Sequence, residues 1–525
     1  MHQGPDMGPW PRSSELEVPL PSRIVRTVIV DGSPLRLEDV VDVAYRRARV
    51  ETGPDLAARL EPARRLVEEA VESGEVIYGI TTGFGALANT HIGRDQTEAL
   101  QYNLLRSHAA GVGDPLPDEM VRAMLLLRAR TLAQGHSGIR PVIVEKLVEM
   151  LERDILPVVP SQGSVGASGD LAPFAHLALP LIGEGKVRVD GRVVSPQEAG
   201  LAPIRLRTKE GLSLLNGTEG MTAMGVLALH EGRRLVEAAD AAVALTVEAL
   251  LGSARPFRPE IHQLRPHPGQ ARSAKRVAAL LDGSPIVASH ADDFDHAVQD
   301  AYSLRCAPQV HGAVIDTLDH MEAVLARELG SVVDNPIVLP ETGEVLSAGN
   351  FHGQPLAFVL DFAAIATAEL GSISERRTDR LLDPARSQGL PAFLAEDAGV
   401  NSGFMIAQYV QAALVAENRV LAHPASVDSV PTSGMQEDHV SMGWGAGRKL
   451  LTVLENVRRV IAIEILCACQ GIECRRPLAP ASGTGRILEL VRERVPPLEE
   501  DRELSADIEA VADLIAHGDL SALLP

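Results

Sequence analysis

Cysteine is scarce in this sequence. Its 525 residues include Cys306, Cys467, Cys469 and Cys474, which are too few for a disulfide framework. The last three lack a second paired motif or a nearby histidine, so buried thiols are favoured over a metal site and no metal ion is predicted. Since no leading segment joins a basic start to an apolar stretch, we expect a protein of the reducing cytoplasm.

Positive charge is in short supply as well. Lysine and arginine number 49 against 70 acidic residues, which gives a net charge of −21 and a pI near 5.2. Binding to phosphate backbones needs clustered lysine and arginine. The composition therefore argues against nucleic acid as a partner and favours a protein that acts on small molecules.

A long uninterrupted apolar run is also missing. The most apolar stretch, residues 355–372, contains Asp361 and Glu369, so it suits a buried core helix and not a membrane span. Because the rest of this stretch is apolar almost all round, one chain does not cover it. We expect subunit association, as a homotetramer.

Helical periodicity dominates what is present. Apolar residues recur at helical spacing over residues 310–325, and similar patterns cover residues 221–251, 354–382, 405–422 and 437–469. Strands are predicted as short hairpins, over residues 28–37 around Asp31-Gly32 and over residues 187–194 around Asp190-Gly191. The fold class is therefore mainly α, with a long central helix bundle and small β-hairpins.

Polar, proline-containing stretches divide the chain into four expected parts. Residues 1–23 are a flexible N-terminal extension, and residues 24–205 form an N-terminal domain. Residues 206–480 form the long-helix bundle, and residues 481–525 form C-terminal helices.

The N-terminal domain contains a turn of small residues with unusual chemical potential, residues 163–173 (GSVGASGDLAP). Attack of the Gly169 nitrogen on the Ala167 carbonyl, with loss of water that includes the Ser168 hydroxyl, gives a methylidene-imidazolone ring (MIO). Glycines allow that close approach, and Asp170 is expected to cap a helix that begins near Leu171. Ala-Ser-Gly alone is a weak signal, because such turns are common.

The surrounding motifs strengthen the signal from Ala-Ser-Gly. Residues 166–173 resemble the signature of the aromatic amino acid ammonia-lyases and aminomutases that use MIO. Four further motifs stand in that family's order: residues 78–85 (YGITTGFG), 215–218 (LNGT), 299–306 (QDAYSLRC) and 349–352 (GNFH). The resemblance implies a bundle of the fumarase/aspartase-like type with an N-terminal active-site portion, and MIO without a diffusible cofactor.

The resemblance also implies catalytic roles. Ser168 supplies the methylene, and Tyr78 takes the β-proton; since a free phenol has a pKa of roughly 10, neighbours must lower the pKa of Tyr78. Asn216 orients the amine or the ring oxygen, and Tyr302 donates hydrogen bonds beside it. Taken singly, such residues are more often a packed tyrosine and a turn asparagine.

Further residues are expected to bind the substrate. Arg305 suits a bidentate grip on a carboxylate, and three-residue spacing puts Gln299, Tyr302 and Arg305 on one helical face. Phe351 belongs to the same substrate-binding set by resemblance.

Substrate choice is expected to depend on His108, which follows Ser107, and on Glu417, which would accept an imidazole N–H. Both resemble the family's histidine-specific members, as do residues 424–431 and 436–442. The predicted reaction is elimination of ammonia from L-histidine to give trans-urocanate, a step of histidine degradation. The alternatives are a tyrosine ammonia-lyase or tyrosine 2,3-aminomutase with the same chemistry, and more remotely a non-catalytic helical scaffold.

The sequence departs from the family pattern at Glu219, where many relatives have glutamine, at Thr81, and at Gly353-Gln354. These departures concern the placement of the amine and the ring, and not the reaction class.

Overall fold

The computed structural model describes residues 26–83, 85–87, 89–90, 92–93, 96–167, 169–291 and 298–524, so the predicted extension over residues 1–23 lies outside them. Helices make up 57% of the structure and strands 8%, which confirms the mainly α prediction. The chain forms two compact units. The first comprises residues 1–223, 326–354 and 428–444, and the second comprises residues 224–325, 355–427 and 445–525. Both units are therefore discontinuous in sequence.

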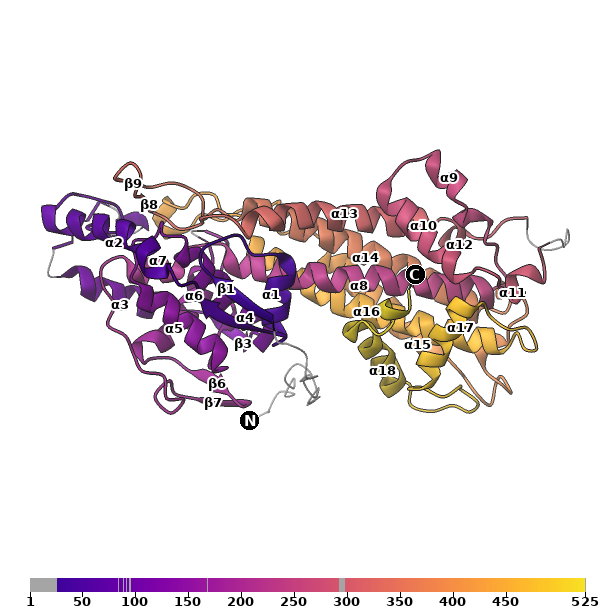
Figure 1. The fold of residues 1–525 in the computed structure, drawn as a ribbon. Coiled ribbons are helices and arrows are strands. Elements are labelled where there is room, and N and C mark those ends of the chain that lie inside the picture. The colour runs from indigo at the N-terminus through magenta and orange to yellow at the C-terminus, as the bar shows by residue number, and fades with distance from the viewer. Residues whose placement is uncertain are drawn as a thin grey trace. The chain divides into compact units, whose positions relative to one another are not determined.

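The first unit is built around a buried helix, α4 (Asp118–Ala133), which packs against α1 (Leu37–Ala44) and α5 (Pro141–Glu152). The hairpin predicted over residues 28–37 is wrong. Strand β1 (Arg26–Val30) pairs in parallel with β2 (Ala48–Thr52), and α1 forms the crossover between them (Figure 1). This arrangement buries the apolar face of α1, which a tight turn at Gly32 would not do.

The second predicted hairpin is confirmed. Strands β6 (Val187–Val189) and β7 (Arg192–Val194) are antiparallel. Their turn has φ values of 48° at Asp190 and 71° at Gly191, as a two-residue hairpin turn requires. Strand β4 (Leu156–Pro157) pairs with β6 in the same sheet. In two further small sheets of this unit, β3 (Val112–Pro115) pairs with β5 (Pro160–Gln162), and β8 (Ile337–Leu339) pairs with β9 (Glu344–Leu346).

Four further helices of the first unit carry or flank the predicted site residues. They are α2 (Leu56–Ser73), α3 (Thr97–His108), α6 (Leu171–Ala178) and α7 (Glu210–Leu215). Helix α3 contacts both α6 and α7, so these segments, distant in sequence, lie together.

Long helices form the second unit. Four of them lie alongside one another for the greater part of their length (Figure 1): α8 (Glu219–Ala249), α13 (Ala307–Glu328), α14 (Gln354–Leu382) and α16 (Gly443–Glu473). Helix α15 (Met405–Leu421) follows α14 and precedes α16 along the chain. These helices confirm the predicted bundle. The helix expected from residue 437 begins instead at Gly443, because residues 437–442 form a loop.

Shorter helices complete this unit. They are α9 (Pro259–Gln263), α10 (Pro268–Leu280), α11 (Pro285–Ala288), α12 (Tyr302–Arg305), α17 (Ser482–Arg492) and α18 (Ser505–His517).

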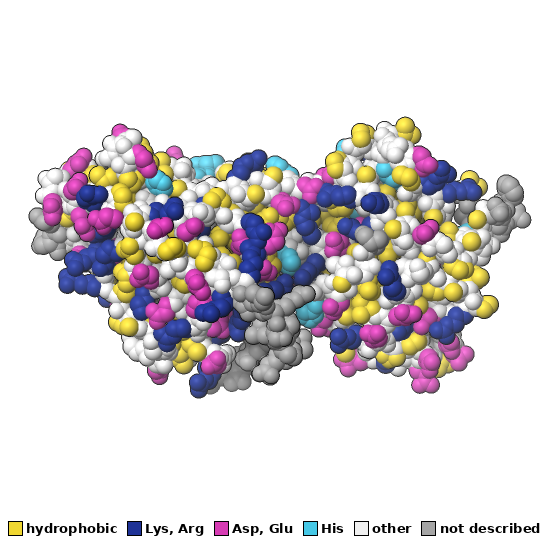
Figure 2. Space-filling view, viewed as in Figure 1, with side chains coloured by type: hydrophobic (Ala, Val, Ile, Leu, Met, Phe, Trp, Pro, Cys, Tyr) yellow, Lys and Arg dark blue, Asp and Glu magenta, His cyan; other side chains and the backbone are white. Residues whose placement is uncertain are grey.

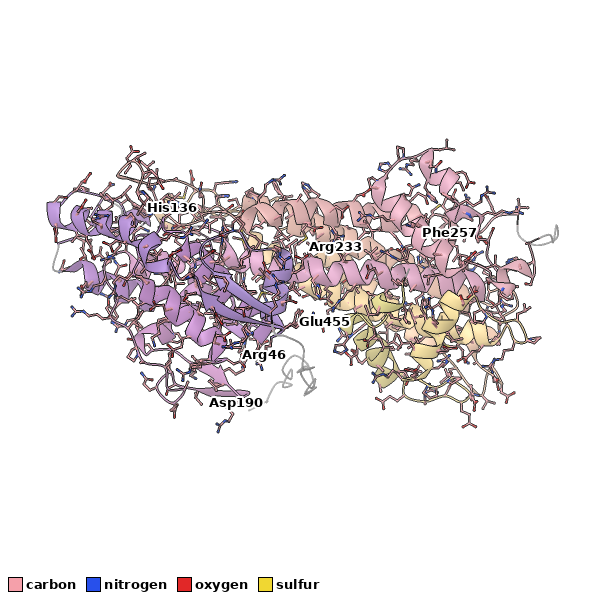
Figure 3. All side chains as sticks on the ribbon, viewed as in Figure 1. Arg46, His136, Asp190, Arg233, Phe257 and Glu455 are labelled. Carbon is pink, nitrogen blue, oxygen red and sulfur yellow. The ribbon has the colours of Figure 1, made fainter. Side chains whose placement is uncertain are left out.

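Polar side chains tie the bundle helices together. Inside it, the carboxylate of Glu464 on α16 accepts hydrogen bonds from Arg377 at 2.8 Å and Ser374 at 2.6 Å, both on α14. At its surface, Arg233 on α8 pairs with Asp319 and Glu322 on α13 (Figure 3). Figure 2 shows acidic and basic side chains interspersed over the visible face. The bundle thus combines an apolar core with specific polar pairs.

Helix α14 is long and apolar enough to cross a membrane, but 61% of its apolar window is buried within the protein. This burial agrees with the predicted core helix. Its outer face nevertheless exposes Phe358, Phe362 and Ile365, each at 44–45%.

Candidate active site

The small-residue turn can be built only with glycine at two positions. Gly166 and Gly169 have φ values of 74° and 76°. A Cβ on Gly166 would collide with the Ser441 hydroxyl, and one on Gly169 would collide with the Gly217 carbonyl. Ala167 is buried beside them. Ser168 lies outside the described residues, but its neighbours form the compact cradle that a backbone ring requires.

Asp170 fastens this turn to the start of α8. Its backbone N–H donates to the Gly217 carbonyl at 2.8 Å, and its carboxylate accepts from the Met221 N–H at 2.9 Å and the Ser164 hydroxyl at 3.0 Å. The expectation that this side chain caps the helix at Leu171 is wrong, because its carboxylate is engaged at the N-terminus of α8. Complete burial raises the pKa of Asp170 to about 7.

A buried ion pair supports the same loop. Arg128 donates to Glu219 at 2.7 Å and to the Asn216 carbonyl at 2.8 Å, and its guanidinium stacks over Phe174. Burial raises the pKa of Glu219. Burial likewise raises the pKa of Glu328 to about 7, and Glu219 contributes to that rise. The departure at Glu219 thus gives this chain an acidic group behind the turn, paired with Arg128.

A cavity of about 580 Å³ opens beside the turn, entirely within the first unit. Three predicted site residues line it, namely Tyr78, His108 and Asn216, and so does Glu437. Other lining residues come from α3, from α6 and α7, and from the segments 83, 85–87, 90, 92 and 433–434; they include Leu104, Leu171, Leu215 and Asn335. Apolar walls with a few convergent polar groups are typical of a small-molecule site.

Tyr78 lies on one wall with its hydroxyl accepting a hydrogen bond from the Gly85 N–H at 3.4 Å. Burial raises its pKa above 10.0, the Gly85 N–H opposes this rise, and the Glu437 charge adds to it. The expectation that neighbours lower the pKa of Tyr78 is therefore wrong for the described structure.

His108 ends α3 and presents an acceptor to the cavity. Its Nδ1 lies 2.9 Å from the Leu104 carbonyl, which requires a proton on that nitrogen. Burial lowers the pKa of His108, so the ring is neutral at pH 7 and Nε2 is the acceptor.

Asn216 is 2% exposed at the end of α7. Its Nδ2 donates to the Asn335 carbonyl at 2.8 Å, which assigns the amide orientation, while no described residue bonds its Oδ1. A buried acceptor in a cavity wall is suited to a ligand N–H.

The other predicted residues are not in the described lining of this cavity. Tyr302 and Arg305 lie on α12 in the second unit; Tyr302 is 72% exposed, and Arg305 stacks on its ring. Gln299 precedes this four-residue helix, so the predicted shared helical face is wrong. Phe351 is half-buried in a turn of the first unit, outside the described lining of the cavity.

Glu417 is not the carboxylate that the structure brings to His108. It is exposed on α15 in the second unit and bonds to Asn456 at 3.0 Å. Glu437 lines the cavity with His108 and Tyr78 instead. The sequence pattern that points to Glu437 lies in residues 436–442. Glu437-Asp438-His439 is typical of the charged first turn of a helix, whereas the structure has a loop here.

Comparisons with known proteins agree with this geometry. Residues 35–493 match the profile of the family described as aromatic amino acid lyase. The histidine ammonia-lyase of Gloeobacter violaceus is 53% identical over 497 residues, covering 94% of this chain and 96% of the relative. That of Deinococcus radiodurans is 53% identical over 490 residues, covering 93% of both chains.

Solved structures give the same result. The crystal structure of histidine ammonia-lyase from Trypanosoma cruzi has a TM-score of 0.87 and 43% identity, covering 95% of this chain and 94% of that chain. The tyrosine aminomutase from Streptomyces globisporus has a TM-score of 0.89 and 40% identity, covering 95% and 98%. The backbone alone thus resembles relatives with different substrates.

Proposed function

The chain belongs to the aromatic amino acid lyase family, and from this premise we propose that it eliminates ammonia from L-histidine to give trans-urocanate. The observation that carries the proposal is the cavity in which a phenol, a neutral imidazole acceptor and a carboxylate meet beside the small-residue turn. Relatives 53% identical over nearly the whole chain support histidine as the substrate.

The cofactor proposed is MIO, formed from Ala167, Ser168 and Gly169 without a diffusible cofactor. The glycine cradle fits such a ring, because neither Gly166, which precedes the ring, nor Gly169, which is part of it, has room for even a methyl group. When formed, the ring supplies an electrophile that turns the amine into a better leaving group.

The chain's own side chains would divide the remaining work. Tyr78 takes the β-proton, and Asn216 Oδ1 accepts an N–H of the substrate ammonium. The neutral imidazole of the substrate has one N–H, and the Glu437 carboxylate and His108 Nε2 are two acceptors of the cavity that could bind it. A phenyl ring has no such donor, so the acceptor that the imidazole would satisfy stays unpaired, at a cost of about 2 kcal/mol or more. Since the pKa of Tyr78 is raised, we expect activity to increase with pH.

Arg305, Gln299, Tyr302 and Phe351 stay proposals by resemblance, with Arg305 as the carboxylate anchor. The Arg305 Nε donates to the Asp300 carbonyl at 2.9 Å, which holds the side chain against its own loop. A substrate carboxylate would pair with the terminal guanidinium nitrogens.

We further propose a cytoplasmic homotetramer. Apolar side chains are exposed on α14, at Phe358 and Phe362, and on α15, at Ile406 and Tyr409. Such a surface is typical of an interface between subunits.

A substrate panel tests the function. Purified protein is incubated with L-histidine, L-tyrosine or L-phenylalanine, and the ultraviolet band of each unsaturated product is followed. Urocanate from histidine supports the proposal; product from tyrosine instead supports the tyrosine lyase or aminomutase. Intact mass separates both from a scaffold, because ring formation removes two waters.

A further inference from the structure

We propose that the turn at residues 432–435 is a positioning device for the cavity: Thr432 orients Glu437, and Ser433 holds the loop that carries Tyr78. Thr432 and Ser433 are thus positioning residues. This inference rests on the function proposed above.

The turn has a strained backbone. Ser433, Gly434 and Met435 have φ values of 50°, 60° and 71°, so two residues with side chains adopt the left-handed conformation. This conformation is unfavourable for residues with a side chain, and such strain is concentrated at functional sites. The ends are closed by paired backbone bonds between Thr432 and Glu437, at 2.9 and 3.3 Å. The chain therefore holds a costly turn in one conformation at the wall of the cavity.

Thr432 acts on the carboxylate. Its hydroxyl donates to Glu437 Oε2 at 2.7 Å, a short bond to a charged acceptor. This bond selects one rotamer of Glu437, in which Oε1 lies 3.9 Å from the place that a Cβ of Gly85 would occupy. With Oε2 engaged by Thr432, Oε1 is the oxygen that remains for an imidazole N–H.

Ser433 acts on the opposite wall. Its hydroxyl oxygen accepts the Ala86 N–H at 3.2 Å, and a Cβ on Gly85 would collide with that oxygen. Gly85, held in this way, donates its own N–H to the Tyr78 hydroxyl. That donor lowers the pKa of Tyr78, so Ser433 acts on the proposed base through two residues.

The experiment compares Thr432→Val, Thr432→Ser, Ser433→Ala and the control Thr317→Val. Thr317 donates to the Ala313 carbonyl at 2.8 Å within α13 of the second unit, so its loss removes a similar hydroxyl bond that is not at the cavity. For each protein, kcat and KM for L-histidine are measured against pH. Calorimetry gives the affinity for imidazolepropionate, which has the ring and carboxylate but no amine to eliminate.

We expect Thr432→Val to weaken imidazolepropionate binding and raise KM roughly tenfold, with a much smaller change in kcat, because an oriented charge-assisted bond is lost. Thr432→Ser restores both values. Ser433→Ala leaves KM near the wild-type value and moves the kcat profile to higher pH, since Tyr78 loses a donor that stabilises its phenolate.

The inference is overturned if Thr432→Val binds imidazolepropionate as the wild type does, if Thr432→Ser fails to restore binding, or if Ser433→Ala leaves the pH profile unmoved. Equal effects in Thr317→Val also overturn it. A wild type that releases no urocanate refutes the proposed function separately, because the affinity ratio between Thr432→Val and wild type needs no turnover.

Discussion

Replacing Glu437 by glutamine separates the carboxylate that the structure brings to the cavity from the one that resemblance suggested. In Glu437→Gln, one of the two carboxylate oxygens becomes an NH2 group. If this group faces Thr432, whose hydroxyl donates to Glu437 Oε2 at 2.7 Å, the hydroxyl must turn to accept from it, and the imidazole N–H meets an uncharged oxygen. If the NH2 group faces the substrate, the imidazole N–H meets an amide N–H. The substitution therefore removes an acceptor and a charge without changing the size of the side chain.

The magnitude follows from the bond that is lost. A hydrogen bond to a charged acceptor contributes about 1.5–3 kcal/mol, and a stranded donor adds a cost of its own. A loss of about 3 kcal/mol corresponds to a decrease in kcat/KM on the order of a hundredfold. Urocanate absorbance at several histidine concentrations measures it.

The pH profile gives a second signature. The Glu437 charge raises the pKa of Tyr78, so its removal must lower that pKa. The rise of kcat with pH should therefore move to lower pH in Glu437→Gln, even as kcat/KM falls. General damage to the fold would not produce this opposite shift.

Glu417→Gln is the matched control, since Glu417 is exposed on α15 and bonds to Asn456. We expect kcat/KM within about twofold of the wild type, as for a surface substitution. A severe loss in Glu417→Gln together with an unaffected Glu437→Gln would refute the reasoning and restore the assignment from the sequence.

Three other predictions concern the ring, stability and assembly. Gly169→Ala should abolish activity and leave the intact mass unshifted by water loss, because its Cβ would collide with the Gly217 carbonyl; a fully active variant refutes the cradle. Burial raises the Glu328 pKa from 4.5 to about 7. The contribution of Glu328 protonation to folding stability is therefore complete below pH 4.5 and is lost as pH rises through 7. Glu328→Gln should thus stabilise the protein at pH 8 by about 3 kcal/mol, and much less at pH 5, by urea unfolding; equal effects at both pH values contradict the assignment. Phe362→Glu, on the exposed face of α14, should reduce the mass found by light scattering, while an unchanged mass removes this face from the interface.

The sequence pattern predicted correctly those elements whose conformation depends on residues close together in the chain. Helical periodicity predicted α14 with the bounds observed, and Asp190-Gly191 predicted its hairpin, because both depend on neighbouring residues. Asp31-Gly32 predicted a hairpin that does not form. The long-range pairing of β1 with β2 buries α1, and this outweighs the preference of two residues for a hairpin turn. Likewise, the helix expected from residue 437 starts at Gly443, and Glu437, in the loop before it, lines the cavity.

The sequence by itself determined the class of chemistry: the glycines around Ala167 make a strained turn possible, and Tyr78, His108 and Asn216 are recognisable by motif. Only the tertiary structure decided which carboxylate joins them. Glu437 is 329 positions after His108 along the chain, and no periodicity relates the two. The folding of residues 428–444 into the first unit makes them neighbours, while Glu417, on a helix of the second unit, faces outward. Likewise, the Tyr78 pKa is raised by burial and by the Glu437 charge, which comes from a residue far away in the sequence, because electrostatic energies depend on distance in space and not in sequence.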